Sequence, residues 1–299
     1  MNRWIKRGLI ALVVLALLAG ALLFTGLQME QRKRDRRVAV PAYSLAQADD
    51  AQALERGKYL FSSRGCAECH GANGAGHVFI DSGGLRAKSP NISSGAGGVV
   101  GSYGVVDWER TIRHGVKPDG RPVFIMPSED YNRLTDADVA ALVAYARSLP
   151  PAQGGPAEFT LPMPVRVLYG FGAIQDAAQK IDHALPPAKP VASGVTVEHG
   201  AYVANMCIGC HGPGLSGGKI PGGPPDWPAA ANLTPGEGSV MGQYGDVKVF
   251  AAMFKSGKRP DGATVRVMPF ESLRELSDVD VQALHVFLKS LPARAAGNR

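Results

Sequence analysis

The sequence predicts an all-α protein in which an N-terminal transmembrane helix precedes two copies of one small domain. Three observations lead to this fold class. Residues 8–27 carry no charged side chain, all four cysteines lie in two C-x-x-C-H motifs, and the segments around the first motif recur about 141 residues later around the second. A repeat at a fixed offset indicates that one structural unit is present twice.

The apolar run at residues 8–27 reads GLIALVVLALLAGALLFTGL, and its 20 residues are enough for a helix to cross the hydrocarbon core of a bilayer. A cleaved signal peptide is the alternative. The run is long for such a peptide, and no clean A-x-A site precedes the polar flank. We therefore expect an uncleaved membrane anchor within residues 1–37.

The positive charge of the chain is confined to this N-terminal segment. Residues 1–37 hold eight of the 32 Lys and Arg residues and two of the 26 Asp and Glu residues, which accounts for the whole net charge of +6. The remaining chain is neutral, so a nucleic-acid-binding protein with a basic folded face is not supported. We expect the RKRDRR run to be a solvated segment beside the membrane rather than a partner site.

The two cysteine motifs read CAECH and CIGCH. Two thiols at this spacing can add to the vinyl groups of one haem, and the histidine that follows then lies under the iron as an axial ligand. A four-cysteine zinc site, a thioredoxin-like redox pair and two structural disulfides are the alternatives. None of them requires a histidine after both pairs, so we predict two covalently bound haem c groups. The predicted attachment residues are Cys66, Cys69, Cys207 and Cys210, and the predicted proximal ligands are His70 and His211.

The repeat extends well beyond the cysteines. The matched positions are Cys66 and Cys207, Asn91 and Asn232, Tyr103 and Tyr244, the Pro-Asp-Gly turns ending at Gly120 and Gly262, Met126 and Met268, and Leu149 and Leu291. The offset changes from 141 to 142 residues after the tyrosines. One domain is therefore expected at residues 50–152 and again at 193–295, with a linker at 153–192 that packs over the domain surfaces.

The second axial ligand of each iron is predicted to be a methionine. Of the eight methionines, only Met126 and Met268 match across the repeat, and each precedes a proline. Methionine ligation raises the reduction potential of a haem relative to bis-histidine ligation. The unmatched methionines of the second copy are expected to fill its core. The histidines without a counterpart, which we expect on the surface or in loops, are His77, His114, His183, His199 and His285.

Each predicted domain begins and ends with a helix. Helices are expected at residues 51–62 and 197–205, and capping residues Thr135 and Ser277 precede apolar residues at helical spacing. A glycine in each opening helix, Gly57 and Gly200, would allow close approach to the closing helix. The alternative is a surface position that merely tolerates glycine. No alternating pattern that would predict a strand is found.

This order of elements (a helix, C-x-x-C-H, glycine-rich loops, Met-Pro and a closing helix) resembles class I cytochrome c. More narrowly, the segments SPNISSGAGGVVGSYG, RTIRHGVKPDGRPVFIMP and LTDADVAALVAYARSLPP resemble the multihaem cytochrome c subunits of membrane-bound periplasmic alcohol and gluconate dehydrogenases. Those subunits typically carry three haems and often a C-terminal attachment, whereas this chain has two motifs and an N-terminal apolar run.

The resemblance implies an electron-transfer protein rather than an enzyme. It would sit in the bacterial inner membrane with its N-terminus in the cytoplasm and its haem domains in the periplasm. Electrons would come from a dehydrogenase and pass to an oxidase, the quinone pool or a soluble cytochrome. The alternative is a dihaem redox enzyme, of peroxidase or thiosulfate-oxidising type, which would need an open or unusual ligand position at one iron.

Overall fold

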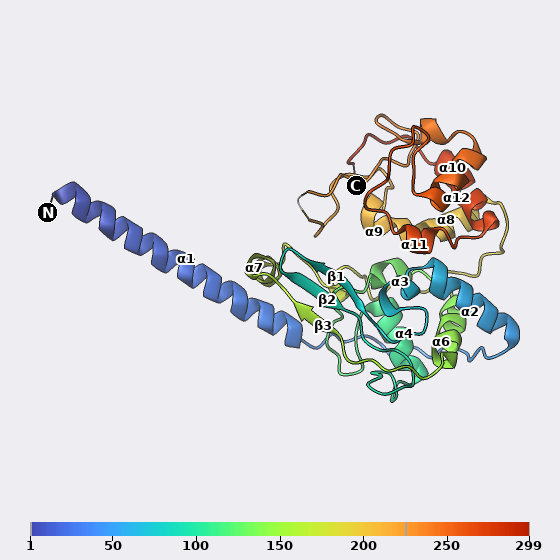
Figure 1. The fold of residues 1–299 in the computed structure, drawn as a ribbon, viewed down its shortest axis with the longest axis horizontal. Helices are drawn as coiled ribbons and strands as arrows, with labels where there is room; N and C mark the ends of the chain where they lie inside the picture. The colour runs from blue at the N-terminus through green and yellow to red at the C-terminus, as the bar shows by residue number, and fades with distance from the viewer. Residues whose placement is uncertain (1, 225, 299) are drawn as a thin grey trace.

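The computed structural model describes residues 2–224 and 226–298. Its first helix, α1 (Arg3–Asp35), projects away from the remaining chain (Figure 1). This helix is long and apolar enough to cross a membrane, and no part of its most apolar stretch is buried against the protein.

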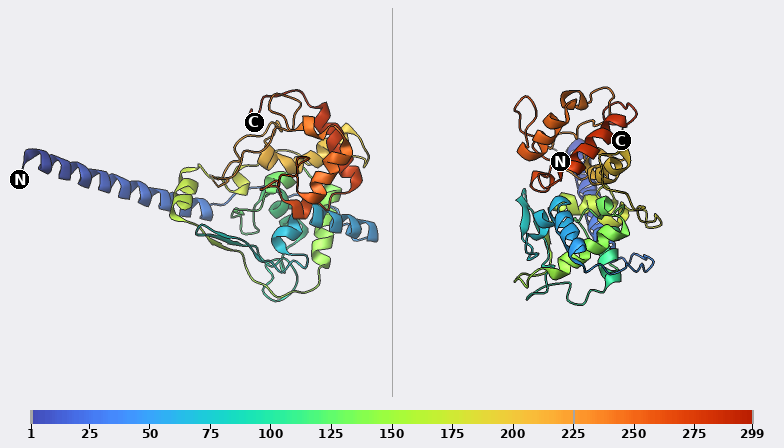
Figure 2. Two further views of the ribbon diagram at one scale, coloured as in Figure 1. Left: turned by 45° about the horizontal axis from the view of Figure 1, so that its top comes forward. Right: turned by 90° about the vertical axis from the view of Figure 1, so that its right-hand side faces the viewer.

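The rest of the chain contains the same order of helices twice, as two bodies packed against each other (Figures 1 and 2). The first body comprises α2 (Ala51–Ser63), α3 (Cys66–His70), α4 (Val105–His114), α5 (Ser128–Tyr131) and α6 (Asp136–Ser148). The second comprises α8 (Val197–Ala204), the short 3-10 turn η2 (Asn205–Cys207), α9 (Ile208–His211), η3 (Met241–Tyr244), α10 (Val247–Ser256), α11 (Phe270–Leu273) and α12 (Asp278–Ser290). Each body is built on its own cluster of buried apolar side chains.

The opening and closing helices form where the sequence predicts them, because each has a capping side chain. Asp50 and Thr196 cap α2 and α8, and Thr135 and Ser277 cap α6 and α12. Each of these side chains accepts a hydrogen bond from a backbone N–H of the first turn, which is otherwise without an intrahelical partner.

The glycine in each opening helix is required by the crossing with the closing helix. A Cβ at Gly57 would lie 2.0 Å from the carbonyl oxygen of Ala141, and a Cβ at Gly200 would lie 2.0 Å from that of Ala283. Only a residue without a side chain permits this approach of two helix backbones. The expected close contact is therefore confirmed at both positions.

The helical fold class is correct for most of the chain, but the expectation that no strand is present was wrong. Strands β1 (Val78–Ser82), β2 (Leu85–Lys88) and β3 (Glu158–Thr160) form an antiparallel sheet in the order β1-β2-β3. The β1–β2 hairpin turns at Gly83 and Gly84, both of which have positive φ. A Gly-Gly pair between short apolar runs is a hairpin signal.

The linker packs mainly on the first body and on α1. It contains β3, then α7 (Met163–Phe171), which lies against α1, and the 3-10 turn η1 (Ala177–Gln179). Ala177 lies against Gly115 of the first body and donates its backbone N–H to the carbonyl oxygen of Val123. The linker therefore connects the first body to the end of the projecting helix.

The basic run that follows the apolar segment is not simply solvated, contrary to the sequence-based expectation. Arg36 donates two hydrogen bonds of 2.6 Å to the buried carboxylate of Asp176, which also accepts one from the hydroxyl of Tyr169. Lys33 donates to the backbone carbonyl oxygen of Tyr169 at 2.9 Å. Two of the basic side chains therefore attach α1 to the linker.

We predict that Gly57→Ala lowers the free energy of unfolding by about 3 kcal/mol, because the added methyl group forces two packed backbones apart. Denaturant unfolding of the full chain measures this loss. Gly245→Ala is the matched control, since Gly245 has φ −61° and ψ −36° and a Cβ there would meet nothing within 4 Å. Equal stability of the two variants would contradict the required close approach.

Candidate haem-binding sites

Each C-x-x-C-H segment folds into a short helical turn that places its thiols on one side. In α3, the cysteines at 66 and 69 are three residues apart and His70 is four residues after the first, which puts all three on one helix face. Gly65 begins this turn with φ 87°, a left-handed conformation suited to glycine. In the second body the same segment spans η2 and α9.

The environment of Cys66, Cys69 and Cys207 differs from that of redox-active thiols. Among the described residues, no disulfide joins Cys66 to Cys69 or Cys207 to Cys210, so the alternative of two structural disulfides is not observed. Burial raises the pKa of the Cys66 thiol to about 12, that of Cys69 to about 11 and that of Cys207 to about 12, whereas redox-active cysteines have a lowered pKa. Within residues 2–224 and 226–298, no three His, Cys, Asp or Glu side chains lie close enough together to hold one metal ion.

The histidine of each motif is held by a backbone carbonyl group. His70 Nδ1 lies 3.0 Å from the carbonyl oxygen of Pro90, and His211 Nδ1 lies 2.8 Å from that of Ala231. A carbonyl oxygen only accepts, so Nδ1 carries the proton and the coordinating nitrogen would be Nε2. Burial lowers the pKa of His70, which favours the neutral ring that binds a metal. The motif residues therefore fit a covalently attached haem.

A buried asparagine stabilises the loop that supplies this carbonyl group in each body. Asn91, which follows Pro90, donates to the carbonyl oxygens of Ala96 and Ala152. Asn232 makes the corresponding bonds to Glu237 and Arg294. The loop beside the histidine is thus joined to the chain that follows the closing helix. The sequence repeat contained both asparagines, but their role was not predicted.

Each repeat-matched methionine packs on the apolar cluster of its own body. Met126 packs against the same apolar cluster as Cys66, and Met268 packs against the same cluster as Cys207. By contrast, Met241 and Met253 are buried members of the second cluster, as expected for methionines that fill a core. Met206 packs against the edge of that cluster.

The placement of the unmatched histidines corrects part of the sequence analysis. His114, His199 and His285 are buried, so the prediction that they lie on the surface or in loops was wrong. His199 bonds to Asp280, and His285 bonds to the carbonyl oxygen of Tyr244. Burial was not predicted because a histidine with one polar partner packs like any other core side chain. The exposed side chain of His77 agrees with the prediction, and His183 is partly buried against His114.

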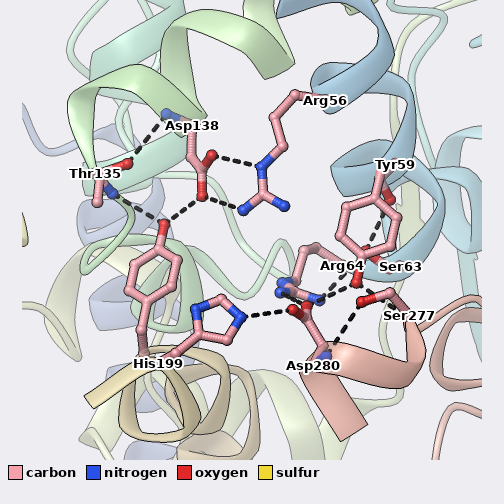
Figure 3. Close-up of polar contacts among 10 residues, drawn as sticks. Arg56, Tyr59, Ser63, Arg64, Thr135, Asp138, His199, Ser277 and Asp280 are labelled. Carbon is pink, nitrogen blue, oxygen red and sulfur yellow. Dashed lines mark hydrogen bonds and ion pairs between the residues drawn. The ribbon is translucent and has the colours of Figure 1, made fainter. Parts of the chain in front are cut away.

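Each body donates a tyrosine hydroxyl to a carboxylate of the other body, a contact that was not predicted. Tyr59 of α2 donates to Asp280 at 2.6 Å and accepts the backbone N–H of Ser277, the capping residue of α12 (Figure 3). In return, Tyr202 of α8 donates to Asp138 at 2.6 Å and accepts the backbone N–H of Thr135, which caps α6.

Each acceptor carboxylate is also held by a base from its own body. Asp138 receives two hydrogen bonds of 2.8 Å from Arg56, and Asp280 lies 2.8 Å from His199 Nε2 (Figure 3). Arg56 and His199 occupy equivalent places, because each directly precedes the glycine at its helix crossing. Both halves of the contact are therefore built on the same plan.

One charge in this interface has no counterpart. Arg64, which is buried, donates to Asp280 at 3.0 Å, whereas the equivalent position two residues before Cys207 is Asn205. Burial alone would raise the pKa of Asp280. The charge of Arg64 and the hydrogen bonds from Tyr59, Arg64 and His199 outweigh burial, so this pKa lies below its ordinary value.

Both C-x-x-C-H segments lie at this interface. Glu68, inside the first motif, accepts a hydrogen bond of 2.8 Å from Ser272 of α11. Asp130 of α5 approaches Gly209, inside the second motif. Burial, followed by the charge of Glu129, raises the pKa of Asp130 to about 8. Each motif therefore contacts the short helix that follows the Met-Pro of the other body.

The first body matches a family of known proteins. Residues 54–150 match the cytochrome c family, whose members carry covalently bound haem c, and they fall within the predicted domain at 50–152.

Most of the chain is similar to cytochrome c subunits of dehydrogenases. It is 30% identical over 273 residues to the fructose dehydrogenase cytochrome subunit of Gluconobacter japonicus, covering 81% of this chain and 53% of that protein. It is 26% identical over 281 residues to the gluconate 2-dehydrogenase cytochrome c subunit of Pantoea cypripedii, covering 84% and 62%. It is also 27% identical over 269 residues to a diheme cytochrome c-type protein of Cereibacter sphaeroides, covering 80% and 86%. The chain thus spans little more than half the length of the first two relatives.

We predict that Asp280→Asn lowers the free energy of unfolding by about 3–5 kcal/mol at pH 7, because it leaves Arg64 buried without a charged partner. The stability that Asp280 contributes is present above its ordinary pKa of about 4 and is lost as the pH falls through its lower folded value. Urea unfolding at pH 7 and pH 3 should therefore show a smaller acid sensitivity in the variant.

The control is Asp278→Asn, which removes an exposed carboxylate from the same first turn of α12. Its effect should stay within about 0.5 kcal/mol. If the two variants unfold alike at pH 7, the interface does not depend on Asp280.

Proposed function

We propose that this chain, which carries a cytochrome c domain at residues 54–150, is a membrane-anchored dihaem cytochrome c that relays single electrons. Residues 50–152 and 193–295 would be two tandem class I cytochrome c domains, each with one covalently bound haem c. The repeated order of helices and the second C-x-x-C-H motif support this assignment of the second body.

The repeat of the cysteine motifs and of the Met-Pro pairs supports one set of haem ligands in each body. The first haem would be attached to Cys66 and Cys69 with axial ligands His70 and Met126. The second would use the corresponding residues, which are Cys207, Cys210, His211 and Met268. An iron with both axial positions filled changes its oxidation state by one electron and offers no open position to a substrate.

The polypeptide would orient the histidine ligands and exclude water from the haems. The carbonyl oxygen of Pro90 orients His70 and that of Ala231 orients His211. The apolar clusters against which Cys66 and Cys207 pack would limit the access of water to the attached haems. A low-dielectric, rigid surrounding limits reorganisation when the charge of a bound group changes.

The observation that carries the relay proposal is the position of both cysteine motifs at one interface. Glu68 of the first motif bonds to Ser272 of the second body, and Gly209 of the second motif lies against Asp130 of the first. Two haems attached at these motifs would be neighbours. The tyrosine exchange between the bodies would hold their separation constant.

The partners are proposed from the relatives. Their names describe cytochrome subunits of fructose, alcohol and gluconate dehydrogenases, so a dehydrogenase is the proposed electron donor. The acceptor would be an oxidase, the quinone pool or a soluble cytochrome. We propose that α1 spans the bacterial inner membrane with its N-terminus in the cytoplasm, because haem c is attached on the periplasmic side.

We predict that Met126→Ala and Met268→Ala each remove about half of the sulfur-to-iron charge-transfer absorption of the oxidised protein, because each variant takes away one of two methionine ligands. Optical spectroscopy of the full chain measures this loss. Met253→Leu, which changes a buried methionine of the second core, should leave the absorption intact. Full absorption in Met126→Ala or Met268→Ala would refute that ligand.

The relay itself is tested in membranes from cells that produce the chain. We expect one of fructose, an alcohol, gluconate or nicotinate to reduce its haems, since the similar proteins serve dehydrogenases with these names. Reoxidation should follow when a quinone or oxygen is added. Haems that dithionite reduces but none of these substrates reduces, together with rapid consumption of hydrogen peroxide, would favour the dihaem enzyme instead.

A further inference from the structure

Helix α7 in the linker has an apolar surface that no other part of the described chain covers. Its sequence is MPVRVLYGF, with one charged residue among nine. Tyr169 and Gly170 are buried, but Met163, Leu168 and Phe171 are 44–46% exposed. Three large apolar side chains exposed on one nine-residue helix indicate a surface that meets something other than water.

The position of α7 along α1 shows the level at which this surface lies. A Cβ on Gly170 would lie 2.1 Å from the carbonyl oxygen of Gly26, and a Cβ on Gly26 would lie 3.0 Å from the ring of Phe171. Gly26 belongs to the last turn of the uncharged run at residues 8–27. If that run crosses the hydrocarbon core, the ring of Phe171 lies at the depth of its outer edge.

Ionic contacts hold α7 at this depth. Arg166 of α7 pairs at 2.9 Å with Glu30, whose side chain is almost completely buried. Lys33 donates to the carbonyl oxygen of Tyr169, the residue before Gly170. Both contacts are made with the part of α1 that follows the apolar run. If that run crosses the bilayer, this part of α1 lies toward the headgroups.

On α1, large apolar side chains that precede the contact with α7 are exposed as well. On α1, Leu22, Leu23 and Phe24 are 40–65% exposed, just before Gly26. A spanning helix places such side chains among acyl chains. The adjoining side chains of α7 would meet the same lipids, and the exposed Arg32 and Arg37 just beyond would meet headgroups.

We propose that α7 lies in the outer interfacial layer of the bilayer that α1 spans, with Met163, Leu168 and Phe171 in contact with lipid. This inference rests on the membrane anchor in the proposed function. It gives the chain two rigidly joined membrane contacts, one spanning and one interfacial. The haem-bearing bodies then hold one orientation above the membrane instead of rotating about a single flexible stalk.

The test uses the unmodified full chain in phospholipid nanodiscs whose lipids carry a diazirine on the acyl chain. After illumination, mass spectrometry locates the cross-linked peptides. We expect cross-links in residues 20–25 and in 163–171, and none in α10, whose Val249 is an exposed apolar residue far from α1 (Figure 1). Cross-links in residues 20–25 without any in 163–171 would overturn this inference alone. No cross-links in either segment would overturn the membrane anchor as well.

A spin label gives an independent depth. The label is attached to Phe171→Cys or to Val249→Cys, and its collisions with oxygen and with a water-soluble nickel chelate are compared. The label at 171 should favour oxygen and the label at 249 should favour the chelate. A label at 171 that collides with the chelate as often as the label at 249, or that is shielded from both reagents, would overturn the lipid contact.

Wild-type protein should take up no label, because haem attachment consumes its four thiols. Labelling of the wild type would refute the covalent haems and leave the cross-linking result to decide the position of α7.

Discussion

The arrangement of the two bodies depends on a carboxylate that accepts a tyrosine from the opposite body. Asp138 and Asp280 each sit in the first turn of a closing helix, and each binds a base from its own body and a tyrosine from the other. The tyrosine oxygen also accepts the backbone N–H of the helix cap. Each tyrosine thus supplies a partner for a backbone N–H at a helix terminus and for a buried carboxylate, and it joins the two bodies. The joined bodies have both cysteine motifs at their shared interface.

Local features of the chain were predictable because their signals are local. The helix caps at Thr135 and Ser277, the glycines at 57 and 200 and the paired methionines could all be recognised within short segments or by the repeat. The hairpin at Gly83 and Gly84 carried a usable signal that a search for alternating strands missed. The boundaries of the two opening helices were accordingly predicted to within about one residue.

The interface could not be predicted in the same way, because it joins residues far apart in sequence through geometry alone. Tyr59 and Asp280 are 221 residues apart, and nothing in the surroundings of either residue specifies the other. Asp138 and Asp280 were recognisable as acidic residues in the first turn of capped helices. Because that role alone explains an acid at these positions, the sequence did not indicate a second role in an interface. The basic run after the apolar helix was misjudged for the same reason, since Asp176 lies 140 residues from Arg36.

The reciprocal tyrosine contacts bear on how the chain arose and on which residues can differ between its two halves. Two identical subunits related by a twofold axis make each contact twice, once in each direction. The two bodies of this chain do the same, so the chain resembles a homodimer encoded in one polypeptide. Fusion supplies a high effective concentration of each half for the other. Fusion also allows equivalent positions of the two halves to carry different residues, which is impossible in a homodimer of identical chains. Arg64 is such a residue, because Asn205 occupies the equivalent position in the second half. The two halves therefore differ in charge although they share one arrangement of contacts.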